Sequence, residues 1–438
     1  MAQTSTRLFG VTFAEPDGPL DPRGIPQEFV DTPGLYVHIP FCSRLCPFCP
    51  YNKVLFHPRA ASDYMSRLRR EISWYGNLGP FTSLYVGGGT PTLAWKDLEF
   101  LSDLPVAGER AIEVLPSHMT PTMAQRLDGI GFDSVSLGVQ SFHDSVLRHL
   151  QRPNTAAQNL RAVPVARETF ACVDVDLIFD VAYDDPSILL GDLATAFSMG
   201  VDQVSTYPLM RFGYTPFGKA HHDRRAEHRL LAQAADLAEG YGYRRSSVWT
   251  FLRRDGQVYS SITRPYYLGL GAGAASFTGS SFLVNHFGLP QYEAAVDADH
   301  PPVALRAQLP PAAAAAYRIF WQAYTGAVTP GGDKLMSHLV ARSAVATALA
   351  LGWAQGDQQR GVELTRAGYD HFHDAERWVT YHLIEPLWEQ MMAEHNRGRC
   401  PTHQGPAGQV TGTRSRWRSQ AGSMDSGVTT SSSTATSP

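Results

Sequence analysis

Between residues 35 and 285, short runs rich in β-branched and aromatic residues alternate with amphipathic helical patterns. The predicted strands are 35–39, 83–86, 111–115, 134–139, 173–179, 203–207 and 244–251. The predicted helices between them are 63–75, 122–127, 155–167 and 224–239. Because strand–helix alternation favours a parallel sheet with crossover helices, we predict an α/β fold. Six or more such units curl into a full or partial barrel, whose chemistry sits at the carboxyl ends of the strands.

The rest of the chain divides by composition. Residues 1–33 are rich in Gly and Pro and predict an extended lead-in before a barrel domain at 34–285. Residues 286–398 predict a small, mainly helical C-terminal domain. Its expected helices are 312–325, 334–352 and 375–395. Residues 399–438 are rich in Gly, Ser, Thr and Arg with few apolar residues, so we predict a disordered tail.

Three cysteines lie in one short loop directly after the first predicted strand of the barrel. Cys42, Cys46 and Cys49 have the spacing Cys-x3-Cys-x2-Cys. Thiolates this close can converge on a soft metal centre. Three of them on a cubane iron–sulfur cluster leave one iron without a protein ligand, free to bind a cofactor or substrate. The spacing therefore favours cluster chemistry.

Two other uses of these cysteines remain open at this point. A zinc site could take His38 or His57 as its fourth ligand, although no second paired spacing follows. A disulfide is less consistent with the chain, because only Cys172 and Cys400 remain and the total of five is odd.

Charge and hydropathy set the class of protein. The chain has 438 residues and a net charge of -4, which does not indicate a nucleic-acid partner. No apolar run is long enough to span a bilayer. We therefore expect a soluble, cytoplasmic protein that acts on a small molecule.

Further polar and glycine residues lie within or just after successive predicted strands. They are the segment 87–92 (GGGTPT), Glu113, Gln140 with Arg152 twelve residues later, and Asp176. Three glycines let a backbone approach a bound molecule closely, and exposed N–H groups can hold its polar parts. Each position alone is ambiguous between a packing and a ligand-binding role. Their order, one per strand, favours a ligand.

These motifs together resemble the radical S-adenosylmethionine (SAM) superfamily, in the branch of oxygen-independent coproporphyrinogen III oxidase. The resemblance covers residues 36–395 and depends on four segments, 36–49, 87–92, 136–142 and 269–276. It implies a partial (β/α)6-type, TIM-like barrel. It also implies a [4Fe–4S] cluster on Cys42, Cys46 and Cys49, with SAM on the fourth iron.

The resemblance implies roles for individual residues. Gly88, Gly89 and Thr90 would line the methionine end of SAM, and Glu113 would hold its amine. The carboxylate and ribose of SAM would be positioned by Gln140, Arg152 and Asp176. The cluster loop and the adenine side would be shaped by Tyr36 and Phe48. One electron would then cleave the sulfonium and release a 5′-deoxyadenosyl radical. A one-electron donor such as a flavodoxin or ferredoxin is implied as a partner.

The subgroup is predicted from positions at which this chain differs from the other members of the branch. The oxidase has a fourth cysteine where this chain has Tyr51, and the heme chaperones have a heme-binding pattern where this chain has 259–267. That stretch resembles the class C radical methyltransferases, which use two SAM molecules. The second SAM would be held by Gln257 and the segment 269–275, which ends at Ala275. Alternatively, the segment packs as a glycine-rich strand. Candidates for substrate contact or proton transfer are Tyr259 and Arg264.

The leading prediction is therefore methylation of an sp² carbon of a small aromatic or heteroaromatic metabolite. The first alternative is an oxidative decarboxylase of the coproporphyrinogen oxidase type. The second is a heme chaperone without turnover.

Overall fold

The computed structural model describes residues 6–8, 10–180, 185–218, 223–256, 264–329 and 335–397. Two predicted site residues, Gln257 and Tyr259, lie outside these ranges, and so does the predicted tail at 399–438.

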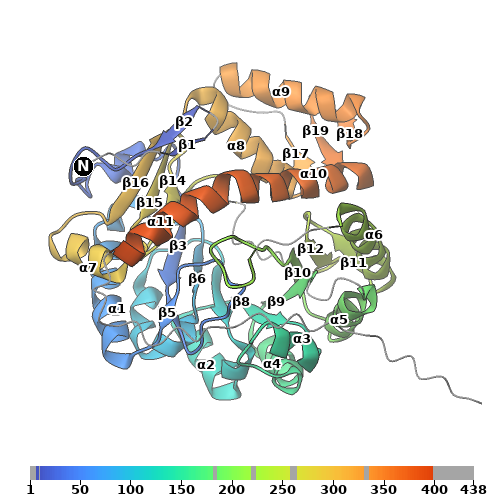
Figure 1. The fold of residues 1–438 in the computed structure, drawn as a ribbon, viewed down its shortest axis with the longest axis horizontal. Coiled ribbons are helices and arrows are strands. Elements are labelled where there is room, and N and C mark those ends of the chain that lie inside the picture. The colour runs from blue at the N-terminus through green and yellow to red at the C-terminus, as the bar shows by residue number, and fades with distance from the viewer. Residues whose placement is uncertain are drawn as a thin grey trace, which may run out of the picture. The chain divides into compact units, whose positions relative to one another are not determined.

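A twelve-stranded sheet forms the centre of the described fold (Figure 1). Six of its strands are parallel and follow one another in space in chain order. They are β3 (Gly34–Ile39), β6 (Leu84–Gly88), β7 (Arg110–Val114), β8 (Ser134–Gln140), β9 (Cys172–Phe179) and β10 (Gln203–Pro208). The two ends of the sheet, β11 and β16, are not paired with each other, so the barrel is partial. The predicted α/β fold of barrel type is confirmed.

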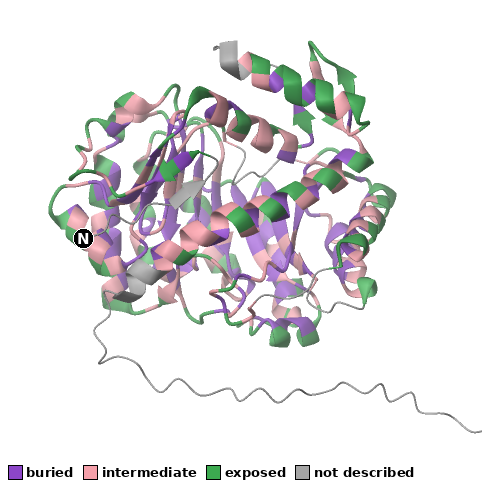
Figure 2. Ribbon diagram, turned by 45° about the horizontal axis from the view of Figure 1, so that its top comes forward, coloured by how far each residue is buried: buried purple, intermediate pink, exposed green. Residues whose placement is uncertain are grey.

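Helices cover the outer side of the parallel strands (Figure 1). They are α1 (Pro58–Ser73), α2 (Pro121–Ile130), α3 (Asp144–His149), α4 (Ala156–Thr169), α5 (Pro186–Ser198) and α6 (Arg224–Gly240). The strands are buried on both faces, as parallel strands in α/β proteins are (Figure 2). Local sequence sets the helix starts: Thr155 and Gln158 form a reciprocal capping box at α4.

The last predicted strand, 244–251, is wrong as a single element. The chain forms β11 (Tyr243–Arg245), reverses, and returns antiparallel as β12 (Thr250–Arg253). The apolar run was interrupted by Ser246 and Ser247, which lie in the turn. Polar turn residues inside a β-rich run are typical of a hairpin.

The other edge of the sheet continues beyond the parallel strands. β13 (Tyr267–Leu270) is parallel to β3, and β14 (Ala275–Phe277), β15 (Ser281–Asn285) and β16 (Val303–Gln308) follow antiparallel. α7 (Leu289–Asp297) lies between β15 and β16. The sheet thus crosses the predicted domain boundary at 286, and the boundaries themselves stay predictions.

The C-terminal part has helices at the predicted places 312–325 and 334–352, two helices where one was predicted at 375–395, and a small sheet that was not expected. The helices are α8 (Pro311–Tyr324), α9 (Leu335–Ala350), α10 (Arg366–Val379) and α11 (Glu385–Arg397). A π-helical turn, Thr380–Ile384, joins α10 to α11. The small sheet consists of β17 (Ala327–Val328), β18 (Ala354–Asp357) and β19 (Gly361–Leu364). Its strands are too short to show a clear alternation in sequence.

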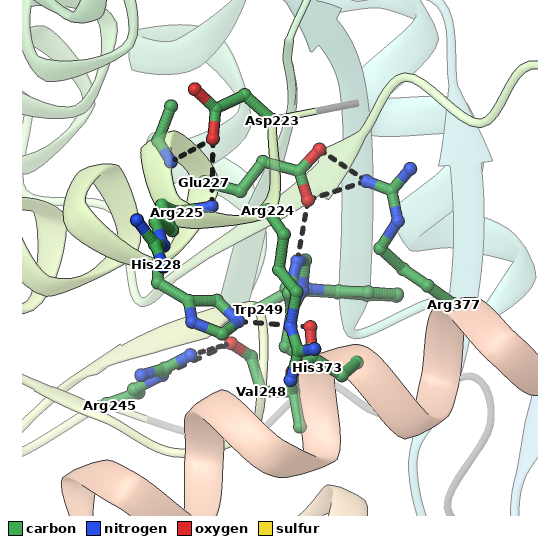
Figure 3. Close-up of polar contacts among 12 residues, drawn as sticks. Asp223, Arg224, Arg225, Glu227, His228, Arg245, Val248, Trp249, His373 and Arg377 are labelled. Atoms are coloured by element: carbon green, nitrogen blue, oxygen red, sulfur yellow. Dashed lines mark hydrogen bonds and ion pairs between the residues drawn. The ribbon is translucent and has the colours of Figure 1, made fainter. Parts of the chain in front are cut away.

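A buried polar network fixes α10 against the barrel (Figure 3). Glu227 on α6 accepts hydrogen bonds from Arg377 and His373, both on α10. The indole N–H of Trp249 donates to Nδ1 of His373 at 2.9 Å. Because breaking a buried, satisfied ion pair is costly, this network holds the C-terminal helices in a defined position over the sheet.

Within the described residues, the helices that occur are too short or too polar to cross a bilayer.

Candidate active site

The cysteine loop lies at the carboxyl end of β3. The chain leaves β3 at Ile39, passes through β4 (Phe41–Cys42), and returns at β5 (Val54–Leu55), which pairs with β4. Cys46 is buried, whereas Cys42 and Cys49 are partly exposed. The loop packs on an apolar cluster at the ends of β9 and β10. That cluster includes Phe48, Val146, Leu150, Ile178, Leu209 and Phe217.

Polar groups from two other motifs reach the cysteine sulfurs. The Thr90 hydroxyl lies 3.9 Å from Cys42 Sγ, and Nη1 of Arg152 lies 3.7 Å from Cys46 Sγ. Lys53 donates to the carbonyl of Cys49. Burial, then the nearby Cys49 thiol, raises the pKa of Cys42 to about 12. A bound metal centre would oppose this rise by stabilising the Cys42 thiolate.

The donor set fits a cluster better than a single zinc ion. Across the part of the chain that the structure describes, no three His, Cys, Asp or Glu side chains are grouped closely enough to hold one metal ion. A cubane binds each thiolate on a different iron, so its ligands lie further apart than those of zinc. His38, a possible zinc ligand, uses both ring nitrogens, with Tyr36 Oη at 2.8 Å and the Asn52 carbonyl at 3.0 Å.

The N–H groups of the GGGTPT segment do not form the predicted cradle. Gly88 donates to Glu113, Gly89 to the Ile39 carbonyl at 2.8 Å, and Thr90 to the Phe41 carbonyl at 2.7 Å. The expectation of free N–H groups for a ligand is therefore wrong at these three residues. The donors instead join β6 to β3 and to the cysteine loop.

The glycines are required by crowding within the protein. A Cβ on Gly88, whose φ is +110°, would lie 2.6 Å from the His38 ring. A Cβ on Gly89 would lie 2.6 Å from the Phe41 carbonyl oxygen. The segment thus lets the end of β6 pack directly under the cysteine loop.

Glu113 lies beside this segment and is partly exposed. Its carboxylate accepts from the Tyr85 hydroxyl at 2.6 Å and from the Gly88 N–H at 3.1 Å. Burial raises the pKa of Glu113, and these two hydrogen bonds oppose the rise. A carboxylate has about four acceptor positions, so two donors leave room for a bound ammonium group.

Gln140 and Arg152 are brought together at the end of β8. Arg152 donates to the Gly138 carbonyl at 2.7 Å, and a Cβ on Gly138 would touch both the Arg152 and Gln140 side chains. Gln140 has a φ of +67°, beside a register shift between β8 and β9. A non-glycine residue in this conformation is strained, and such strain gathers at functional sites.

Asp176 lies on β9 within a second group of acids and hydroxyls. The Ser136 hydroxyl lies 2.7 Å from Asp176 Oδ2 and 3.4 Å from Asp174 Oδ2, and Ser205 donates to Asp174 at 3.0 Å. Burial, together with the Asp174 charge, raises the pKa of Asp176 well above its ordinary range. Two buried carboxyls this near each other favour sharing a proton.

The resemblance assigned Tyr36 and Phe48 to the cluster loop and the adenine side. Tyr36 on β3 lies beside the Tyr85 ring, at 5.9 Å between centroids, and Phe48 is buried in the apolar cluster under the loop. Neither position by itself tests the roles in binding the cofactor.

Arg264 is not brought to this end of the barrel. It precedes β13, and its guanidinium pairs with Glu109 at 2.9 Å, just before β7 begins. Arg264 therefore lies at the amino ends of the strands, opposite the cysteine loop. There it borders a cavity of about 300 Å³ with Tyr266, Tyr317 and Trp321 of the same region.

The segment that ends at Ala275 is engaged within the protein. Gly271 donates to Glu71 at 2.9 Å, and Gly273 donates to the His286 carbonyl at 2.9 Å. The Asn52 side chain, at the end of the cysteine loop, donates to the carbonyls of Ala272 and Phe287. These contacts support the packing interpretation of the segment.

Several residues at the site were not identified from sequence. They are Tyr51, Lys53, Tyr85, Ser136 and Asp174. The alternation of polar residues along the strands could have indicated Tyr85, Ser136 and Asp174. No sequence pattern indicated Tyr51.

Comparison with known proteins gives matches along the barrel. The model of the radical SAM superfamily matches residues 36–185. The heme chaperone HemW of Bacillus subtilis is 26% identical over 273 residues, which cover 57% of this chain and 72% of that protein. The oxygen-independent coproporphyrinogen III oxidase of Synechocystis is 26% identical over 311 residues, 61% of this chain and 65% of the oxidase. The chain thus spans about two thirds of each relative.

The fold matches a solved structure over more of the chain. Coproporphyrinogen III oxidase (HemN) from Escherichia coli, described as a radical SAM enzyme, superposes with a TM-score of 0.69. The match covers 83% of this chain and 93% of that one at 22% identity. At this identity the likeness supports the fold.

Proposed function

The chain belongs to the radical SAM superfamily, and on this premise we propose that it is an enzyme that binds a [4Fe–4S] cluster on Cys42, Cys46 and Cys49. One observation carries the proposal. Thr90 and Arg152, from two separate motifs, reach the sulfurs of Cys42 and Cys46 at the carboxyl end of the barrel. When bound, the cluster and SAM supply one-electron reduction of the sulfonium and abstraction of a hydrogen atom.

The residues around the cysteine loop would hold the amino-acid end of SAM. Glu113 would accept from the ammonium group, because Tyr85 and Gly88 already orient its carboxylate. A bound cation would also lower the raised pKa of Glu113 and keep it ionised. Since the N–H groups of the glycine segment are used, its carbonyl oxygens are the groups that suit an ammonium.

Arg152 would act on two negatively charged groups. Its contact with Cys46 stabilises the thiolate, and its guanidinium is suited to the SAM carboxylate. The Gly138 carbonyl and Asn154 hold the guanidinium in place, with Nε 3.2 Å from Asn154 Oδ1. Gln140, in its strained conformation, would complete this side.

Asp176 would receive the ribose hydroxyls. Ser136 orients one of its oxygens, and Asp174 favours a shared proton, so the pair can both donate and accept. The apolar cluster around Phe48 limits water at the cysteine loop, which strengthens the electrostatic contacts there.

For the reaction, we propose a tetrapyrrole-type small molecule and hydrogen abstraction of the coproporphyrinogen oxidase kind. The names of the reported relatives, a heme chaperone and two coproporphyrinogen III oxidases, support this alternative better than methyl transfer. The N–H groups of Gly271 and Gly273 are also used within the protein, which supports the packing interpretation of this segment. The leading prediction of methyl transfer therefore finds no support.

The test is anaerobic reconstitution with iron and sulfide, followed by reduction in the presence of SAM. The proposal expects 5′-deoxyadenosine and methionine, and release of carbon dioxide when coproporphyrinogen III is added. Transfer of label from methyl-labelled SAM would instead favour the methyltransferase. Stable heme binding with no SAM cleavage would contradict the enzyme and support a chaperone.

A further inference from the structure

Tyr51 is exposed although its neighbours Phe48 and Asn52 are buried. Its side chain is 54% exposed, whereas Cys46, Phe48 and Asn52 are each less than 10% exposed. A large aromatic ring that is exposed between buried neighbours suggests a contact surface.

The backbone at Tyr51 is firmly held, so the exposure does not come from a loose loop. Asn52 donates to the carbonyls of Ala272 and Phe287, at 3.0 and 2.9 Å, and its own carbonyl accepts from His38. The Tyr214 hydroxyl donates to the Pro50 carbonyl at 3.5 Å. A rigid backbone presents the Tyr51 ring with little conformational entropy to lose on binding.

A second ring meets Tyr51 from the C-terminal helix. The Trp388 ring on α11 lies 5.7 Å from the Tyr51 ring, between centroids, with the planes at 57°. Behind Trp388, the buried ring of Phe212 is stacked at 6.2 Å and that of Phe287 lies edge-on at 6.4 Å. Trp388 is therefore backed by packed aromatic rings and itself stays partly exposed.

The position of α11 is also determined. The hydroxyl of Tyr381 accepts from the Arg211 N–H at 3.0 Å, and Glu385 accepts from the Gly213 N–H. Both donors belong to the segment that follows β10. The C-terminal helix is thus joined to the carboxyl end of the sheet where Tyr51 lies.

We propose that Tyr51 and Trp388 form an aromatic clamp that binds a flat, π-rich ring of the substrate. The inference rests on the proposed function, because it places the pyrrole rings of a tetrapyrrole against these two side chains. Offset or tilted stacking on tyrosine and tryptophan suits such rings. The Tyr51 hydroxyl donates a hydrogen bond to the bound ring system.

The experiment measures binding of coproporphyrin III to the reconstituted protein by the shift and quenching of porphyrin absorption and fluorescence. Compared with wild type, Tyr51→Ala and Trp388→Ala are each expected to raise the Kd about tenfold, the size of a lost aromatic contact. Tyr51→Phe, which keeps the ring, is expected to raise it only about threefold. Because Tyr51 is exposed, its variants are expected to fold even if Trp388→Ala loosens α11.

The matched control is Tyr241→Ala, an exposed tyrosine at the end of α6 that also contacts a neighbouring ring. It is expected to bind the porphyrin like wild type. Wild-type affinity in both Tyr51→Ala and Trp388→Ala would overturn the clamp. A wild-type protein that cleaves SAM but does not bind the porphyrin would overturn the clamp and the tetrapyrrole substrate, and would leave the proposed cleavage of SAM standing. Porphyrin binding through the two residues without SAM cleavage would support the clamp and contradict the proposed function.

Discussion

Two glutamates in this protein have nearly the same hydrogen-bond partners and different surroundings. Glu71 on α1 accepts from the Tyr292 hydroxyl at 2.7 Å and the Gly271 N–H at 2.9 Å. Glu113 on β7 likewise accepts from a tyrosine hydroxyl and a glycine N–H. Glu71 has a third donor, Asn285, and is 1% exposed, whereas Glu113 is partly exposed at the carboxyl end of the sheet.

The difference separates two glycine-rich segments that look alike in sequence. The glycine-rich segment beside Glu71 joins β13 to α1 and to the cysteine loop. The Glu71 carboxylate therefore stabilises the fold. The carboxylate beside Gly88 has acceptor positions left over, and Thr90 of the same glycine-rich segment reaches Cys42 Sγ. A buried carboxylate needs partners, and an ammonium ligand would supply one to Glu113.

The largest expected effect tests the role of Glu113 in binding SAM. Glu113→Ala removes the carboxylate that would pair with the SAM ammonium, and such charged pairs contribute about 2–5 kcal/mol. We expect SAM binding to weaken at least about thirtyfold, measured by equilibrium dialysis on reconstituted protein. The exposed Glu99→Ala is the matched control. Unchanged SAM affinity in Glu113→Ala would contradict the role of Glu113.

The structural side is tested by Glu71→Ala. The substitution leaves the donors of Tyr292, Gly271 and Asn285 without their acceptor, so the free energy of unfolding should fall by about 2–4 kcal/mol. Denaturant melts followed by circular dichroism measure it. If Glu71→Ala were as stable as wild type and instead lost SAM affinity, the two glutamates would have exchanged roles.

Glu71 also gives a pH dependence. Burial raises the pKa of Glu71 from its ordinary 4.5 to about 7, so the folded protein holds this proton more tightly than the unfolded chain does. Its contribution to stability is therefore full below pH 4.5 and declines as the pH rises to about 7. Relative to Glu71→Gln, wild type should lose about 1–3 kcal/mol of stability between pH 5 and 8. A constant difference across this range would contradict the shift.

The smallest expected effects come from the two tyrosines that donate to these carboxylates. Tyr85→Phe should weaken SAM binding about fivefold and leave the melting temperature nearly unchanged, since one hydrogen bond to a carboxylate is lost. Tyr292→Phe should lower the free energy of unfolding by about 1 kcal/mol and leave SAM binding unchanged. The same change in both variants would remove the distinction between the two sites.

Sequence was sufficient for the six parallel strands, because buried parallel strands are continuous apolar runs with helices between them. It was insufficient for the β11–β12 hairpin and for the short strands of the small sheet, where pairing across the chain decides the structure. The cysteines, Thr90, Glu113 and Arg152 were found from motif order. The hydrogen bonds of the Gly88, Gly89 and Thr90 N–H groups were not found from the sequence. They join β6 to β3 and the loop after it, and neither segment alone indicates which donors and acceptors will meet.

The central claim is that the cysteine loop holds a redox cluster that cleaves SAM. It is tested by iron content and 5′-deoxyadenosine formation in reconstituted wild type and in Cys42→Ala, Cys46→Ala and Cys49→Ala, with the buried Cys172→Ala as control. We expect about four iron atoms per chain and SAM cleavage in wild type and in Cys172→Ala, and loss of both in the three loop variants. A loop variant that kept its full iron content and cleaved SAM like wild type would contradict the account.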